Sequence, residues 1–336
     1  MSGILRRARK GAFAARRGVR RAVGRLRGAP RLTWSLRISA PAGPAGDVWG
    51  DVYYAEDLAA ALRRLGQEVY VDRLEQRIRP VARLRDDVVL QLTGLHRPEL
   101  VPGAVNVIWV ISHPECRDAE ELRRFDLRYA ASGRWAARIA AEDGVEVRAL
   151  PQATAPDRFT PRRSGDELTS DVLFVGKTRR VFRPIVRDAV AVGADLTIYG
   201  DGWGDFIDPS HVAAEFLDNA RVPDAYRGAR IVLNDHWREM AEEGFLSNRL
   251  FDAVAAGARV ISDPVESKDA DFGGAVRFAA TQEELAALLD PAEPGWPDDA
   301  RMREIAADVA ARHSFDRRAE TLLADVLAVR GRRGGA

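Results

Sequence analysis

Two short apolar runs between residues 231 and 263 enclose a polar loop and a helical pattern. The runs, 231–233 and 259–262, are rich in Val and Ile and have the length of buried strands in a parallel sheet. Apolar residues within 247–256 recur at helical spacing, and Gly257 follows where a left-handed helix cap is favoured. The segment therefore predicts the order strand, loop, helix, strand, which is the repeating unit of α/β proteins.

The loop between the first strand and the helix is rich in polar side chains: Asn234, His236, Trp237, Glu242, Glu243, Ser247, Asn248 and Arg249. In an α/β protein such a loop lies at the carboxyl end of a strand, beside a helix N-terminus, where anions bind. Arg249 falls in the first helical turn, where a cation opposes the helix dipole, so its position favours a bound anion. The alternative is a surface Arg249 paired with Glu242 or Glu243.

The sequence GFLSNRLFDAVAAGARVIS, residues 244–262, resembles the nucleotide-sugar-binding segment of GT-B glycosyltransferases. The resemblance is to the CgeB-like branch, which is related to family four. Asp252 stands where the second glutamate of the family motif usually stands, and Glu243 lies one residue further upstream than the first. The resemblance implies an α/β protein with two Rossmann-like domains and parallel sheets, a donor nucleotide bound by the second domain and an acceptor bound by the first.

The resemblance also implies roles for individual residues. Arg249 and Lys177 would stabilise the departing diphosphate, Asn248 would donate hydrogen bonds, Asp252 would accept them from the ribose, and Glu243 would contact the sugar. The family-four relation implies retention of configuration, with inversion and His113 as the base left open. The expected donor-binding residues are Gly176, Lys177, Asn234, Ser247, Asn248, Arg249 and Asp252.

Strands and helices alternate along most of the chain. The first half predicts strands at 32–39, 68–71, 87–92, 105–111, 127–131 and 145–150, and helices at 52–65 and 132–142. The second half predicts strands at 171–176, 196–199, 216–217, 231–233 and 259–262, and helices at 181–192, 223–227, 247–256, 281–289, 301–312 and 315–329. The predicted domains are a basic helix at 1–30, an acceptor domain at 31–156, a linker at 157–170, a donor domain at 171–312, and a last helix at 313–330 that returns to the first domain.

The segment GDVWGDVYYAEDLAAALRRLGQEV resembles the first loop and helix of GT-B amino-terminal domains. Gly46, Gly50 and Asp51 in it are expected to form the acceptor-side loop, because glycine lets the backbone approach a ligand closely. His113 follows a predicted strand and suits an acceptor-facing residue or a general base. A turn in which His113 satisfies only a local hydrogen bond is the alternative.

Charge is distributed unevenly along the sequence. Residues 1–37 hold twelve of the 51 Lys and Arg residues and none of the 50 acidic residues, which leaves the rest of the chain net acidic. Within 1–30 the basic residues share one helical face, and Phe13 does not fit the apolar face opposite, which is formed by Ile4, Leu5, Ala8, Ala12, Ala15, Val19, Ala22, Val23 and Leu26. This pattern predicts a helix lying on an anionic membrane surface. A basic tail without fixed structure, or one that touches nucleic acid, is the alternative. The acidic remainder disfavours nucleic acid as the main partner of the folded part.

We expect a cytoplasmic protein, attached at the inner face of the membrane if residues 1–30 bind lipid. No apolar run is long enough to cross a membrane, and the single cysteine, Cys116, excludes an internal disulfide. Metal ligands lack a recognisable spacing, and the sequence DAD at 269–271 arises readily by chance in an acidic chain, so we expect neither a metal nor another cofactor.

The expected function is transfer of a sugar from a nucleotide-diphosphate sugar to an acceptor. The expected acceptor is a cell-envelope glycan, a glycolipid or a metabolite. The alternative is a catalytically silent protein that binds sugar nucleotides or glycans in envelope or spore-coat assembly. An oxidoreductase is disfavoured, because YGDGWGD at 199–205 lacks the third glycine spacing of a dinucleotide-binding loop.

Overall fold

The computed structural model describes residues 30–74, 86–93 and 96–334. The chain forms two compact units. The first contains the described residues up to Ala130, together with Ala136–Arg148 and the chain from Phe315 onward, and the second contains Ala131–Trp135 and Ala149–Ser314. The basic helix predicted at 1–30 lies outside the described residues except for residue 30, so it remains a prediction.

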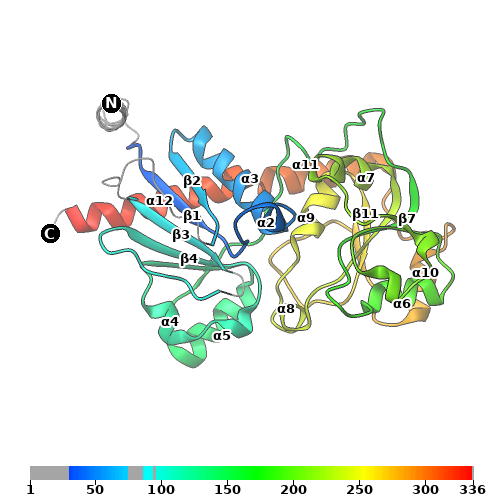
Figure 1. Cartoon of the computed structure of the whole chain (residues 1–336), viewed down its shortest axis with the longest axis horizontal. Helices are drawn as coiled ribbons and strands as arrows, with labels where there is room; N and C mark the ends of the chain where they lie inside the picture. Colours follow the sequence, from blue (N-terminus) through cyan, green and yellow to red (C-terminus); the bar gives the residue numbers. More distant parts are fainter. Residues whose placement is uncertain (1–29, 75–85, 94–95, 335–336) are drawn as a thin grey trace, which may run out of the picture. The chain divides into compact units, whose positions relative to one another are not determined.

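The first unit is built on a six-stranded sheet in the order β2-β1-β3-β4-β5-β6 (Figure 1). Pairing is parallel from β2 through β5. Every residue of β1, β3 and β4 is buried, as expected for strands of a parallel sheet that is covered on both faces. The strands are β1 Thr33–Arg37, β2 Glu68–Asp72, β3 Val88–Thr93, β4 Val105–Val110, β5 Leu127–Ala130 and β6 Arg148–Ala149. The helices are α2 Pro44–Asp47, α3 Gly50–Arg64, the 3-10 helix η1 Pro114–Cys116, α4 Ala119–Arg123, α5 Gly133–Asp143 and α12 Phe315–Gly334.

The second unit contains another six-stranded sheet, in the order β12-β11-β10-β7-β8-β9, and all its pairings are parallel. The strands are β7 Ser170–Val175, β8 Leu196–Tyr199, β9 Val212–Ala214, β10 Ala229–Asn234, β11 Arg259–Ser262 and β12 Val276–Phe278. The helices are α6 Pro184–Ala191, α7 Val222–Gly228, α8 Arg238–Glu242, α9 Asn248–Ala255, α10 Gln282–Leu289 and α11 Asp299–Arg312, with 3-10 turns η2 Trp203–Asp205, η3 Pro209–His211 and η4 Asn219–Arg221.

Each face of the second sheet has its own core, because successive residues of a strand point to opposite faces. Val232 of β10 packs in one core with residues of α9 and α11. Its neighbours Ile231 and Leu233 pack in the other core, with residues of α6 and α10. The helices thus cover both faces of the sheet, so binding sites are expected where the strands begin or end, and in the adjoining loops.

The segment predicted as an interdomain linker, 157–170, lies within the second unit. Phe159 is buried in that unit's core, where its ring lies 6.1 Å from that of Tyr226. The backbone N–H of Thr154, which we expected in the acceptor domain, donates to the carbonyl of His313 at 2.8 Å in the same unit. The second unit therefore takes in the chain from Ala149, before the linker that the proline content of 157–170 suggested.

Most predicted elements are confirmed, and so is the predicted α/β fold class with two parallel sheets. The strand predicted at 216–217 is wrong: Phe216 is 51% exposed, and the strand that pairs with β8 is β9, four residues upstream. The helix predicted from residue 181 begins only at Pro184, whose fixed φ suits a first helical position. The helices α2, α4 and α8 and the strand β12, which the sequence reading missed, are all short.

Candidate functional site

The carboxyl ends of β7 and β10 lie at the same edge of the second sheet, because these strands are parallel neighbours. β7 ends at Val175 and β10 at Asn234. Helix α9 begins at this edge, since the hydroxyl of its N-cap residue, Ser247, donates to Asn234 Oδ1 at 2.7 Å. Two strand ends and a helix N-terminus therefore meet at one place, which is an arrangement that binds anions.

Arg249 lies between these strand ends. Its Nη2 donates to the carbonyl of Val175 at 2.6 Å, and its Nη1 donates to Asn234 Oδ1 at 3.1 Å. The guanidinium lies 5.1 Å from the centre of the Phe174 ring. The alternative of a surface arginine is therefore wrong, and Glu242 pairs instead with Arg238, at 2.7 Å.

Two further arginines reach the same edge, and the sequence reading missed both. Arg183, immediately before α6, is buried over the Phe174 ring and forms two hydrogen bonds with Asp235, of which Nε to Oδ2 measures 2.7 Å. Its Nη1 donates to the carbonyl of Lys177 at 3.0 Å. Arg179 has a φ of 60°, and its guanidinium stacks 4.0 Å from the centre of the Trp237 ring.

These guanidinium groups lie close enough to repel one another. Burial, followed by the charge of Arg249, lowers the pKa of Arg179 to about 10. Burial also lowers the pKa of Arg183, and the charges of Arg179 and Arg249 lower it further. Because the protonated forms are destabilised by their own neighbours, a bound anion would be strongly stabilised here.

Gly176 provides the space in which Arg183 and Arg249 approach the strand end. A Cβ atom on Gly176 would lie 3.0 Å from Arg183 Nη1, 3.2 Å from Phe174 and 3.3 Å from Arg249 Nη2. Lys177, the next residue, is exposed, and its ammonium group makes no hydrogen bond or ion pair within the described ranges. Lys177 is therefore an exposed cation beside the strand end at which the arginines are held.

Polar side chains after β10 and β11 hold α9 in place. Asn234 Nδ2 donates to Ser262 Oγ at 2.8 Å, while Asn234 Oδ1 accepts from Ser247 and Arg249. His236 Nε2 accepts the N–H of Ser247 at 3.0 Å, so its proton is on Nδ1, which lies 2.6 Å from Asp263 Oδ1. Asn234 and Ser247, predicted to bind the donor, thus position Arg249 and the start of α9.

Asp263 was not predicted as a site residue. Burial alone would raise its pKa, but hydrogen bonds from His236 and Ser262 outweigh burial and hold the pKa below its usual range. The carboxylate therefore stays ionised and fixes the His236 ring, which in turn accepts the N–H of Ser247, the N-cap residue of α9.

The remaining predicted donor-site residues lie close by in the chain. Asn248 Nδ2 donates to Asp252 Oδ2 at 2.6 Å, one helical turn away. Glu243 ends α8, and its carbonyl accepts from Ser132 Oγ at 2.6 Å. Contacts of Asp252 with a ribose and of Glu243 with a sugar remain predictions.

The predicted acceptor-side residues lie in the first unit. Asp51, in the first turn of α3, is mostly buried, which raises its pKa, and the nearby His113 lowers it by less. His113 has a φ of 51°, uncommon for a residue other than glycine, and its Nδ1 lies 2.9 Å from Glu115 Oε1. Gly46 is packed rather than open, since a Cβ atom would lie 1.9 Å from the Pro41 carbonyl oxygen, whereas Gly50 has free space.

No cluster of three or more His, Cys, Asp or Glu side chains that could hold a metal ion occurs among the described residues. In the DAD sequence, Asp269 accepts the Gly133 N–H at 2.9 Å and Asp271 accepts the Gly273 N–H at 2.8 Å. Both aspartates therefore stabilise loops. In the part of the chain that the structure describes, no helix is long and apolar enough to cross a membrane.

Comparisons with known proteins agree with this geometry. The family model described as glycosyl transferase-like matches residues 177–324. AviGT4, a glycosyltransferase involved in avilamycin A biosynthesis, is a similar solved structure, with a TM-score of 0.61 at 18% identity over 89% of this chain and 98% of that one. A search of curated protein sequences found no match.

Two other solved structures have the same fold. The trehalose-6-phosphate synthase OtsA has a TM-score of 0.57 at 11% identity, over 88% of this chain and 98% of that one. The T4 phage BGT in complex with its UDP-glucose substrate has a TM-score of 0.54 at 12% identity, over 88% of this chain and 98% of that one. The two Rossmann-like units and these solved structures show the GT-B fold, and residues 177–324 match the glycosyl transferase-like family model, which together support a GT-B glycosyltransferase. Its relation to the CgeB-like branch rests on the sequence resemblance.

Proposed function

We propose that this protein transfers a sugar from a nucleotide-diphosphate sugar to an acceptor, and that its second unit binds the donor diphosphate at the carboxyl ends of β7 and β10. The observation that carries this proposal is the convergence of three guanidinium groups on that edge, those of Arg179, Arg183 and Arg249, beside Lys177, which follows β7 within two residues. Two carboxylates, Asp235 and Asp263, lie among them. The excess positive charge suits a ligand with at least two negative charges.

The geometry suits stabilisation of a leaving group. As the bond from the sugar to the diphosphate breaks, negative charge grows on the diphosphate, and fixed cations accelerate the reaction when they stabilise that charge. Arg249 is held in place by Val175 and Asn234 before any ligand binds, so little reorganisation is needed. Lys177 is free to follow the phosphate oxygens.

We further propose a UDP-sugar donor, because the T4 phage relative was solved with UDP-glucose, and no metal or other cofactor. The proposed acceptor is a cell-envelope glycan, a glycolipid or a metabolite, since the solved relatives act in pathways as different as avilamycin A and trehalose 6-phosphate synthesis. The CgeB-like resemblance supports retention of configuration, with Asp252 binding the ribose and Glu243 the sugar. The proximity of Asp51 to His113 supports inversion with a first-unit base as the second possibility.

The deciding experiment measures release of nucleotide diphosphate from a panel of sugar nucleotides in the presence of an acceptor extract. We expect release by the wild type, and a fall in turnover of about 10²–10³-fold for Arg249→Gln, the range for removing one preorganised donor. Ground-state affinity should fall less than turnover, because the charge on the diphosphate grows in the transition state. Lys177→Ala should act in the same direction without endangering the fold, since Lys177 is exposed.

The matched control is Arg238→Gln, which removes an exposed guanidinium from α8, outside the cluster. It should leave turnover within about twofold, as surface changes usually do. Nuclear magnetic resonance of the product then gives the anomeric configuration. A wild-type protein that binds the nucleotide diphosphate in thermal melts but releases none from any donor would be a silent binding protein.

A further inference from the structure

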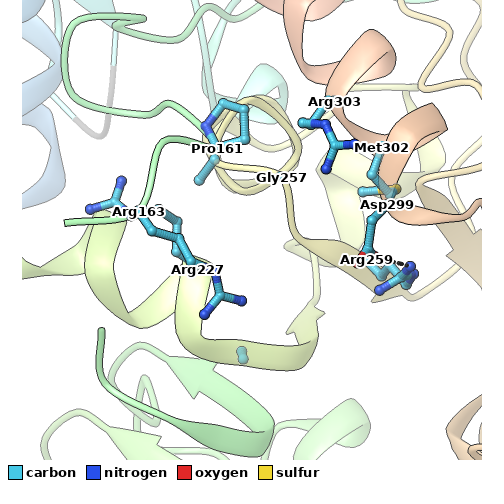
Figure 2. A pocket seen from close by; sticks show the side chains of 10 residues that line it. Pro161, Arg163, Arg227, Gly257, Arg259, Asp299, Met302 and Arg303 are labelled. Carbon is cyan, nitrogen blue, oxygen red and sulfur yellow. Dashed lines mark hydrogen bonds and ion pairs between the residues drawn. The ribbon is translucent and has the colours of Figure 1, made fainter. Parts of the chain in front are cut away.

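A cationic pocket lies at the end of the second sheet where β10 and β11 begin, opposite the strand ends described above. Ala229 and Arg259, the first residues of these strands, line it, as does Gly257 at the end of α9. Its volume is about 160 Å³. Figure 2 shows the pocket between two groups of side chains: Arg163 with Arg227 on one side, and Arg259, Asp299, Met302 and Arg303 on the other.

The pocket carries more positive charge than its own contacts neutralise. It is lined by four arginines and a single carboxylate, Asp299, which pairs with Arg259 at 3.1 Å. Neither Arg163 nor Arg303 makes a hydrogen bond or an ion pair within the residues that the structure describes, and both are exposed. These two guanidinium groups are therefore available to a ligand.

Arg227 adds a buried donor. Its side chain is only 8% exposed; Nη1 donates to the Thr160 carbonyl at 3.1 Å, and Nη2 pairs with Asp224. Its Nε is buried without a hydrogen-bond acceptor in the described part of the chain, and the nearest carboxylate oxygen, on Glu167, lies 4.0 Å away. A buried N–H group without an acceptor is costly, so a ligand or a water molecule that accepts from it would be stabilised.

Stabilisation of helix ends explains only part of this cluster. Arg227 lies in the last turn of α7, where a cation is favourable beside the carbonyl groups. Arg303 is the fifth residue of α11, near the positive end of that helix, and Arg163 lies in a loop, so neither gains from a helix dipole. A bound anion accounts for all of these positions.

The size of the pocket limits the ligand. Pockets for drug-sized ligands measure about 300–1,000 Å³, so this pocket, at about 160 Å³, is smaller than that class. A phosphate group fits within this volume. Arginine suits such a ligand because its planar fork binds two phosphate oxygens at once.

We propose that this pocket binds a phosphate group, either as inorganic phosphate or at the end of a small phosphate ester. The site is separate from the proposed diphosphate site, since the two lie at opposite ends of the parallel strands β10 and β11. It gives the second unit a ligand that is neither donor nor acceptor in the proposed reaction.

The test is a calorimetric titration of the full-length protein with inorganic phosphate, and in parallel with glycerol 3-phosphate, in a buffer free of phosphate and sulfate. We expect a dissociation constant of about a millimolar for the wild type, and an increase of about tenfold or more for the double variant Arg163→Gln with Arg303→Gln. Both side chains are exposed, so the variant should fold normally. Arg163→Lys with Arg303→Lys keeps the charge and should retain most of the affinity.

Two controls locate the bound phosphate. Arg124→Gln with Arg317→Gln removes the same charge from exposed positions in the first unit and should leave the affinity unchanged. Lys177→Ala alters the proposed diphosphate site and should also leave it unchanged. The proposal is overturned if the wild type binds neither phosphate nor its ester, if the pocket double variant binds as the wild type does, or if Lys177→Ala abolishes binding. The lower of the two dissociation constants tells whether free phosphate or an ester is the occupant. No sugar transfer is measured, so this outcome is independent of the proposed function.

Discussion

Asp263 sets the orientation of the residues around the start of α9. It accepts from the backbone N–H of His236 at 3.0 and 3.1 Å and from the His236 ring at 2.6 Å, and the other ring nitrogen accepts from Ser247. In this series of hydrogen bonds, the Asp263 carboxylate accepts from the His236 ring, and the His236 ring accepts from the Ser247 amide. Loss of the carboxylate would therefore weaken the whole chain of hydrogen bonds.

Asp263→Asn is expected to lower the free energy of unfolding near pH 7 by about 1.5–3 kcal/mol, the range for hydrogen bonds to a charged group. The folded-state pKa of Asp263 is depressed, so the stability that it contributes is present above its unfolded pKa of about 3.9 and is lost as pH falls through the lower folded value. Urea unfolding at pH 7 and at about pH 3 measures both free energies. The difference between variant and wild type should shrink at the lower pH.

Asp205→Asn, at an exposed position, is the control and should change stability by less than about 0.5 kcal/mol at either pH. An equal difference between Asp263→Asn and the wild type at both pH values would mean that the carboxylate charge is not what stabilises the site.

The last helix, α12, belongs to the first unit, although it follows the second unit in the sequence. It packs against α3 and β4, and Asp316 at its start accepts from Arg64 at 2.8 Å. Further along, Asp325 accepts from the Tyr129 hydroxyl at 2.5 Å and pairs with Arg148. The apolar face of α12 includes Leu322, which is fully buried.

Leu322→Ala is expected to lower the free energy of unfolding by about 2–5 kcal/mol, because it removes buried methyl groups and leaves a cavity. The next residue provides a matched control: Leu323 is only partly buried, so Leu323→Ala should cost less than half as much. Urea unfolding followed by circular dichroism gives both values. A similar cost at both positions would contradict the packing of α12 through its Leu322 face.

At the scale of the whole molecule, the basic segment at 1–30 adds a proposed attachment to an anionic membrane surface. Each basic residue near such a surface contributes about 1 kcal/mol of attraction, which salt screens over ~10 Å at 0.1 M. We expect the full-length protein to sediment with vesicles that contain phosphatidylserine and to be released by salt. A shortened chain that begins at Arg31 should stay in the supernatant, and neutral vesicles serve as the control.

Equal sedimentation of the full-length and the shortened chain would remove the proposed membrane role of residues 1–30. Sedimentation of the full-length protein with neutral vesicles to the same extent would show that the basic residues are not the cause.

The sequence alone was sufficient for the order of the elements. Strand and helix periods are local, so runs such as 196–199 and 259–262 predicted β8 and β11 with their observed bounds. The resemblance to GT-B glycosyltransferases grouped Gly176, Lys177, Asn234 and Arg249, and the parallel pairing of β7 with β10 brings the strand ends that carry them to a common edge. Short elements such as α8 failed, because a single helical turn has too few residues to show a period.

Only the tertiary structure decided which charged residues meet. Arg183 binds Asp235 across 52 residues of sequence, and His236 meets Asp263 across 27, distances over which no local pattern gives a signal. The phosphate pocket is a similar case, since it joins a loop, the ends of two helices and the start of another. Gly46 shows the converse, because a glycine that looked like an opening for a ligand is closed by the Pro41 carbonyl. Side-chain chemistry is local to the sequence, but the excess of charge that makes a site arises from packing between distant segments.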